Sequence, residues 1–110
     1  IYDFERKMSG FCDLVVETPA RISAEQRAEA IETSRTVVEA LRVRDLARID
    51  YRLGRDGLLY FLEINALPSL EAGASIYAAA SLAGYATVES VIAAVIERAC
   101  HRYGIAEASW

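Results

Sequence analysis

The chain has 110 residues, of which 54% are apolar and 25% charged, with only two prolines and six glycines. This length and composition predict one small folded domain, and they exclude a disordered linker and a whole multidomain enzyme within these residues. The formal net charge of −4 provides no basic surface for nucleic acid or an anionic membrane. Two cysteines, Cys12 and Cys100, are too few for a disulfide framework and favour a reducing, cytoplasmic setting.

The first half of the chain contains signals for a loop, a strand and a helix. Residues 1–10 are polar and predict a loop, which leads into an apolar strand over Cys12–Val16. Ser23 followed by Gln26 forms a capping-box pattern, and the apolar positions that follow recur at helical spacing. We therefore expect a helix over about residues 24–42.

The second half predicts a hairpin followed by two helices. Residues 45–53 and 58–65 are two β-rich runs that flank the turn sequence Gly54–Gly57. An alanine-rich helix is expected over Ala72–Ala83, ending near Gly84. Thr87 can cap a last amphipathic helix, and Gly104 lies beyond its end.

The hairpin groups polar side chains on one face. Because side chains alternate along a strand, Arg48 and Asp50 share one face of the first strand, as do Glu63 and Asn65 on the second. Symmetric closure around the turn pairs Leu53 with Leu58 and Arg48 with Glu63, which places Asp50 diagonal to Glu63. Carboxylate and amide oxygens suit Mg²⁺ rather than zinc, so this face is a candidate magnesium site in which Glu63 could bridge two ions.

A simpler interpretation of the same residues is a solvated sheet face. Arg48 opposite Glu63 would then be an ordinary cross-strand ion pair that contributes about 0.2–1 kcal/mol. Two apolar residues that we expect on the polar face, Leu46 and Phe61, favour a partly covered pocket instead.

Three segments resemble the D-alanine–D-alanine ligase-like ATP-grasp family. They are Ala47–Tyr51 (ARIDY), Phe61–Pro68 (FLEINALP) and Tyr2–Lys7 (YDFERK), in the order and at the separations typical of that family. The resemblance runs from about Tyr2 to Tyr103 and covers the carboxy-terminal part of the ATP-grasp domain. It implies an α+β fold, with an antiparallel sheet and packed helices, in which residues 1–110 are a partial ATP-grasp domain without its amino-terminal parts.

The resemblance also implies a role for each matching residue. Asp50 and Glu63 would hold one magnesium ion, and Glu63 with Asn65 a second. Lys7 would contact the phosphates of ATP, and Leu62 would line the adenine pocket. Arg48 would stabilise the tetrahedral intermediate formed when an amine attacks an acyl phosphate.

The reaction implied by the resemblance is the ATP-dependent joining of a carboxylate to an amine. The cofactors would be ATP and two Mg²⁺ ions, with Mn²⁺ as an alternative, and the products an amide or peptide, ADP and phosphate. The expected partners are a small amino-acid or peptide substrate and the missing amino-terminal part of the same enzyme, with homodimerisation as a further expectation. Neither nucleic acid nor a membrane is expected as a partner.

The sequence departs from the family pattern where the substrate binds. Ser69 follows Pro68 in place of the usual glycine, and Ala74 stands where the family has a serine for the substrate carboxylate, with Ser75 one residue later. Met8 follows Lys7 where an aromatic hydroxyl is common. These differences leave the identity of the substrate open.

Three alternatives for the chain differ in class. The first is the ligase part described above, which we expect not to turn over ATP alone because the resemblance lacks the amino-terminal domain, the first nucleotide lysine and the hinge residues that hold adenine and ribose. The second is a non-catalytic Mg-nucleotide-binding module of ATP-grasp fold. The third, a helical interaction domain over residues 72–99, has little support, since its apolar stripe is more simply core.

Overall fold

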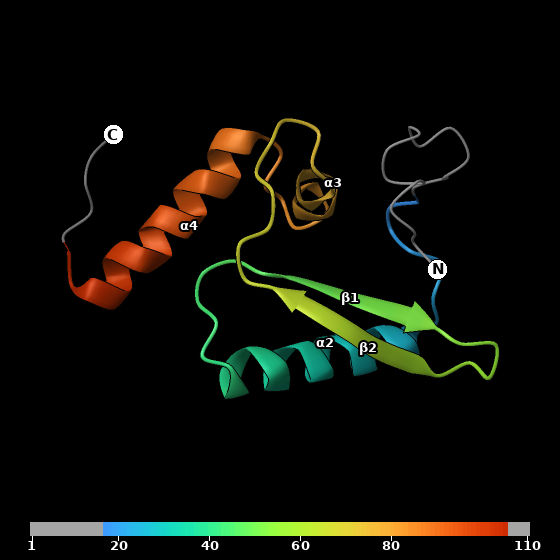
Figure 1. Ribbon diagram of the computed structural model, residues 1–110. Helices are drawn as coiled ribbons and strands as arrows, with labels where there is room; N and C mark the ends of the chain where they lie inside the picture. Colours follow the sequence, from blue (N-terminus) through green and yellow to red (C-terminus); the bar gives the residue numbers. More distant parts are fainter. Residues whose placement is uncertain (1–16, 106–110) are drawn as a thin grey trace, which may run out of the picture.

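The computed structural model describes residues 17–105. The predicted loop over residues 1–10, the predicted strand Cys12–Val16, and with them Lys7 and Met8, lie outside this range. Within it the elements run in the order helix, two strands, two helices (Figure 1). The fold thus mixes helices with an antiparallel sheet of two strands, in agreement with the predicted α+β class. The elements are α2 (Ala24–Ala40), β1 (Arg48–Leu53), β2 (Leu59–Asn65), α3 (Ser75–Ser81) and α4 (Val88–Tyr103).

Helix α2 begins at the predicted capping box. The amide of Gln26 donates to Ser23 Oγ (3.1 Å), and the amide of Ser23 donates to Gln26 Oε1 (2.9 Å). The helix ends at Ala40, slightly before the predicted residue 42, because Arg42 adopts a left-handed φ of 53°. A backbone hydrogen bond from Val43 to the carbonyl of Val38 (3.0 Å) then closes the end of the helix.

Strands β1 and β2 form the predicted hairpin, but their pairing differs from the symmetric one. Leu53 pairs with Leu59 rather than Leu58, and Arg48 pairs with Asn65 rather than Glu63. Leu58 belongs to the loop, since its carbonyl accepts from the amide of Gly54 (2.8 Å) and its amide donates to Asp56 Oδ1 (3.1 Å). These two hydrogen bonds shift the start of β2 by one residue.

A β-bulge shifts the pairing a second time. Tyr51 pairs with Phe61 and Asp50 pairs with Glu63, which leaves Leu62 without a partner on β1. Phe61 therefore shares a face with Tyr51, and the prediction that it lies on the polar face is wrong. The two rings contact edge to face, with centroids 6.0 Å apart and planes at 79°.

The hairpin loop is held by one side chain of β2, one of the loop itself and one of α2. The hydroxyl of Tyr60 donates to Asp56 Oδ2 (2.6 Å), which lowers the pKa of Asp56 and raises that of Tyr60. Gln26 Nε2 donates to the carbonyl of Gly57 (2.8 Å), and Gly57 supplies the positive φ of 80° that the loop requires. The start of α2 is thereby tied to the tip of the hairpin.

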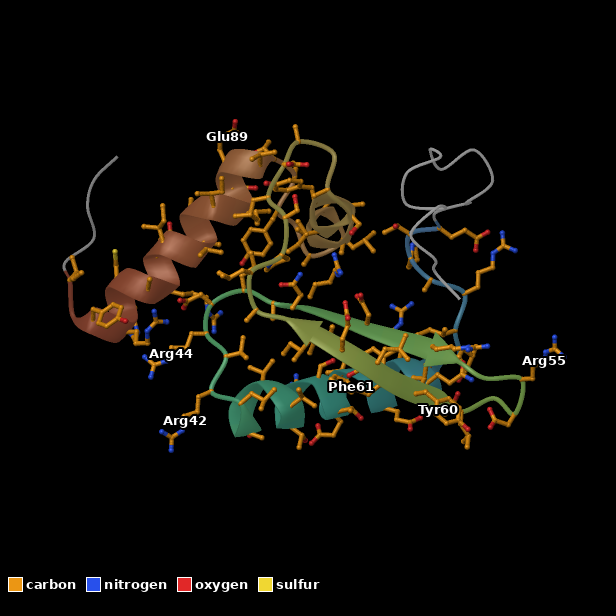
Figure 2. All side chains as sticks on the ribbon, in the orientation of Figure 1. Arg42, Arg44, Arg55, Tyr60, Phe61 and Glu89 are labelled. Atoms are coloured by element: carbon orange, nitrogen blue, oxygen red, sulfur yellow. The ribbon has the colours of Figure 1, made fainter. Side chains whose placement is uncertain are left out.

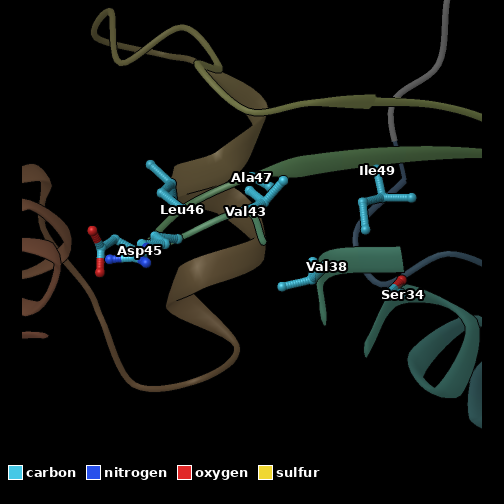
Figure 3. A pocket seen from close by; sticks show the side chains of 8 residues that line it. Ser34, Val38, Val43, Asp45, Leu46, Ala47 and Ile49 are labelled. Carbon is cyan, nitrogen blue, oxygen red and sulfur yellow. The ribbon is translucent and has the colours of Figure 1, made fainter. Parts of the chain in front are cut away.

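Helix α2 runs along one face of the hairpin (Figure 1). The half-buried Tyr51 joins the two, because its hydroxyl donates to the carbonyl of Ala30 (3.2 Å) and shares a hydrogen bond with Ser34 Oγ (2.8 Å). A cavity of about 380 Å³ lies between α2 and the chain entering β1 (Figure 3). Leu46, expected on the polar face of the strand, lines this cavity and lies before β1. The residues that line the cavity are Ser34, Val38, Val43, Arg44, Asp45, Leu46, Ala47 and Ile49.

Helices α3 and α4 follow the hairpin. The alanine-rich helix α3 is shorter than the predicted Ala72–Ala83, because Gly73 (φ 86°) delays its start and Gly84 (φ 92°) follows its end. The predicted ends of α4 are confirmed. Thr87 caps its first turn in a reciprocal pair of hydrogen bonds with Ser90 (both 3.1 Å), and Gly104 ends it with a φ of 65°.

An ion pair connects the end of α4 with the segment that enters β1. Arg102 Nη1 donates to Asp45 Oδ1, and both side chains are largely shielded from solvent. This hydrogen bond lowers the pKa of Asp45 and raises that of Arg102. The last helix thereby fixes the chain just before the strand that carries Arg48 and Asp50.

The core of residues 17–105 is small. Val91, on α4, is 6% exposed and is the one hydrophobic residue of this range that is buried. Leu62 (57% exposed), Leu67 (90%) and Tyr103 (66%) belong to a larger set of exposed apolar side chains. Residues 17–105 also contain no helix long and apolar enough to cross a membrane.

The Tyr51 hydroxyl gives a first test of this packing. Tyr51→Phe removes the hydrogen bonds to Ala30 and Ser34 and keeps the ring, so we expect the free energy of unfolding to fall by about 1 kcal/mol. Urea denaturation of the full-length protein measures the change. Tyr85→Phe, at an exposed tyrosine on the chain between α3 and α4, is the control and should cost less than about 0.5 kcal/mol. Equal losses in the two variants would contradict the proposed link.

The Asp45–Arg102 pair predicts a dependence of stability on pH. Because the folded pKa of Asp45 is lowered, the pair stabilises the fold above the ordinary aspartate pKa of about 3.9, and this contribution is lost as the pH falls through the folded value. Arg102→Gln should therefore destabilise the protein at pH 7, and the difference from wild type should shrink at lower pH. Arg55→Gln, at the exposed tip of the hairpin (Figure 2), should show no such convergence. A difference independent of pH would refute the assignment.

Candidate functional site

Four polar residues meet on the hairpin face opposite to α2. Asp50 lies directly opposite Glu63, and Arg48 directly opposite Asn65. The prediction that the two carboxylates lie diagonal to each other is wrong. They lie directly opposite each other, which strengthens the candidate site. Directly paired side chains have Cβ atoms about 4.5–5.5 Å apart, compared with about 7–8 Å on the diagonal. The bulge at Leu62 therefore brings the carboxylates closer than a regular hairpin would.

Arg48 holds both carboxylates. Its Nε donates to Asp50 Oδ1 (3.0 Å) and its Nη2 to Asp50 Oδ2 (3.2 Å), which forms a two-point pair. The same Nη2 lies 3.7 Å from Glu63 Oε1. The side chains are 43% (Arg48), 37% (Asp50) and 63% (Glu63) exposed, so the cluster is open to solutes on one side.

Asn65 is oriented by the backbone that follows it. Its Oδ1 accepts a hydrogen bond from the amide of Leu67 (3.0 Å), as in an Asx turn. This bond holds the amide group at the end of β2, where the chain turns toward Pro68. An amide oxygen has a second lone pair, so Asn65 Oδ1 keeps the capacity to bind a cation.

The donor set fits a magnesium site with few protein ligands. Asp50 and Glu63 supply carboxylate oxygens, and Asn65 supplies an amide oxygen. Within residues 17–105, no three His, Cys, Asp or Glu side chains converge as a metal site of their own. Mg²⁺ is commonly held by one or two carboxylates, with water and substrate phosphates as its other ligands. The cluster therefore suits an ion that arrives with a phosphate-bearing molecule.

A hollow of about 290 Å³ lies next to Arg48. Its other wall is the loop after β2 and the start of α3: Pro68, Ser69, Glu71, Ala72, Gly73, Ala74, Ser75 and Ile76. The walls contain small side chains, two hydroxyls and the carboxylate of Glu71, which sequence reasoning did not single out. Glu71 lies between the departures at Ser69 and Ala74, and this position could have indicated it.

Two further predicted residues are not brought into the cluster. Leu62 is the unpaired residue of the bulge and is 57% exposed, so its assignment to an adenine pocket stays a prediction. Lys7 lies outside the described residues. Arg48, Asp50, Glu63 and Asn65 are thus the predicted site residues that lie together.

Comparison with known proteins places the chain in a family. Residues 1–97 match the family described as "D-ala D-ala ligase C-terminus". The chain belongs to this family.

Individual relatives agree with this assignment. The chain is 33% identical over 102 residues to a D-alanine--D-alanine ligase A of Mesorhizobium japonicum, which covers 93% of this chain and 28% of the relative. It is 38% identical over 98 residues to a D-alanine--D-alanine ligase of Parabacteroides distasonis, covering 87% and 28%. The vancomycin/teicoplanin A-type resistance protein VanA of Enterococcus faecium is 41% identical over 54 residues, covering 49% and 16%.

The chain therefore spans only about a quarter of the length of its curated relatives. The matches to three further relatives cover 21%, 25% and 18% of their lengths. No solved structure matches it significantly.

Proposed function

We propose that this chain provides the metal-binding and phosphate-binding part of an ATP-dependent carboxylate–amine ligase of ATP-grasp fold. The observation that supports the proposal most directly is the pairing of Asp50 with Glu63, beside Arg48 and Asn65, on an open sheet face. Membership of the D-ala D-ala ligase C-terminus family supports the same reaction class.

The reaction proceeds in two steps. A substrate carboxylate oxygen attacks the γ-phosphorus of ATP, the bond to the bridging oxygen breaks, and an acyl phosphate and ADP form. An amine nitrogen then attacks the acyl carbon and loses a proton, and phosphate leaves from the tetrahedral intermediate to give the amide. Each step brings anionic oxygens together, so the site must compensate negative charge.

The residues of the cluster would each contribute to compensating this negative charge. Asp50 with Glu63 would hold one ion, and Glu63 with Asn65 a second. Mg²⁺, or Mn²⁺ in its place, supplies charge neutralisation on the phosphate oxygens. Arg48 would supply a positive charge where the oxyanion of the second step develops. Lys7 would contact ATP phosphates, and Leu62 would contact the adenine.

The hollow beside Arg48 is the proposed substrate position. Its contact with Arg48 would place a bound amino acid or peptide next to the metal cluster. Ala74 offers a methyl group where the family pattern has a serine hydroxyl, so we propose that the substrate differs from D-alanine. A cytoplasmic location and a nucleotide site completed by an amino-terminal part of the same protein belong to this proposal.

Neutralising either carboxylate tests the proposal. In the longer protein that joins this chain to its proposed amino-terminal part, Asp50→Asn and Glu63→Gln should each lower amino-acid-stimulated, Mg²⁺-dependent phosphate release from ATP by about 100-fold or more, because each removes a charged ligand. Melting temperatures should change little, since both side chains are exposed. Glu29→Gln on α2 is a control that should keep full activity.

Full activity in both carboxylate variants would refute the assignment. Mg²⁺-dependent nucleotide binding without phosphate release by the wild type would instead indicate a non-catalytic module.

A further inference from the structure

We propose that Arg48 is a built-in competitor of the divalent cation: its guanidinium holds Asp50 and Glu63 together until the cation displaces it toward the neighbouring hollow. This inference rests on the proposed function and adds a second role for Arg48.

The geometry places the guanidinium on the oxygens that an ion would use. Both carboxylate oxygens of Asp50 accept from Arg48, at 3.0 and 3.2 Å, and Nη2 also approaches Glu63 at 3.7 Å. Mg²⁺ binds oxygen at about 2.0–2.1 Å, so an ion shared by Asp50 and Glu63 would lie on the same oxygens that the arginine fork contacts. Arg48 in this position and an ion bound to Asp50 and Glu63 therefore compete for the same oxygens.

Electrostatics gives the same result. Two carboxylates directly opposite each other on paired strands repel, and Arg48 compensates that repulsion. A divalent cation compensates it more fully, but it repels the guanidinium at such short range. The two cations therefore alternate on one pair of carboxylates.

The displaced guanidinium has a second position available. Arg48 also lines the hollow next to the loop after β2, where Glu71 supplies a carboxylate. When that carboxylate or an anionic substrate oxygen accepts Arg48, the arginine leaves the metal ligands free. Cation binding to the cluster and anion binding in the hollow should then strengthen each other by the same factor.

Removing the competitor should tighten cation binding. In the full-length protein without nucleotide, Mn²⁺ titration followed by electron paramagnetic resonance should show that Arg48→Met binds Mn²⁺ about 3- to 10-fold more tightly than wild type. Arg48→Lys, which keeps the charge but not the fork, should lie between the two. Arg52→Met is the matched control, since Arg52 lies four positions further along the same strand, opposite Tyr60, and the Mn²⁺ affinity of this variant should equal that of wild type.

A second measurement uses the unaltered protein. With ¹⁵N-labelled arginine, the Nε–H signal of Arg48, assigned by its absence in Arg48→Met, should shift as Mg²⁺ is added, while that of Arg52 should not. A static Arg48 signal at saturating Mg²⁺ would overturn the inference.

The outcomes separate this inference from the proposed function. If wild type and variants all fail to bind Mn²⁺, both without nucleotide and with a non-hydrolysable ATP analogue, the proposed metal site is wrong. If wild type binds Mn²⁺ and Arg48→Met binds it equally or more weakly, the metal site stands and the competition is refuted. Circular dichroism of each variant identifies a loss of folding, and the signal of the unaltered protein then decides.

Discussion

The strand pairing on either side of Leu62 is the constraint on which the site depends. Phe61 and Glu63 are two residues apart, so a regular strand would place both on one face. The bulge lets Phe61 contact Tyr51 on the helix side while Glu63 faces Asp50 on the open side. One unpaired residue thus lets Phe61 and Glu63 lie on opposite faces of the hairpin, which regular alternation would not allow.

The polar face is organised by charge compensation more than by burial. Asp50 and Glu63 are kept close by Arg48, and all three side chains remain partly exposed. Exposed ion pairs contribute little to stability, so the fold itself depends little on this cluster.

Local signals in the sequence predicted the parts of the fold that local hydrogen bonds determine. The caps of α2 and α4 at Ser23 and Thr87 are examples, as is the turn between the strands. The alternation of side chains along each strand predicted which residues belong to the polar cluster. It did not predict which of them pair across the hairpin, because the loop hydrogen bonds of Leu58 and a bulge shift the register of the two strands. Contacts between distant segments, such as Arg102 with Asp45, leave no periodic signal in the chain.

That distant contact has a consequence for interpreting variants. Asp45 adopts a φ of 65°, a conformation that costs a non-glycine residue energy even though aspartate tolerates it better than most. Arg102, 57 residues further along the chain, donates a hydrogen bond to Asp45 and so holds the backbone there, just before the strand that carries Arg48. A substitution near the end of α4 can therefore alter ligand affinity by rotating the entry into β1. Such an effect would be no sign that the helix touches the ligand.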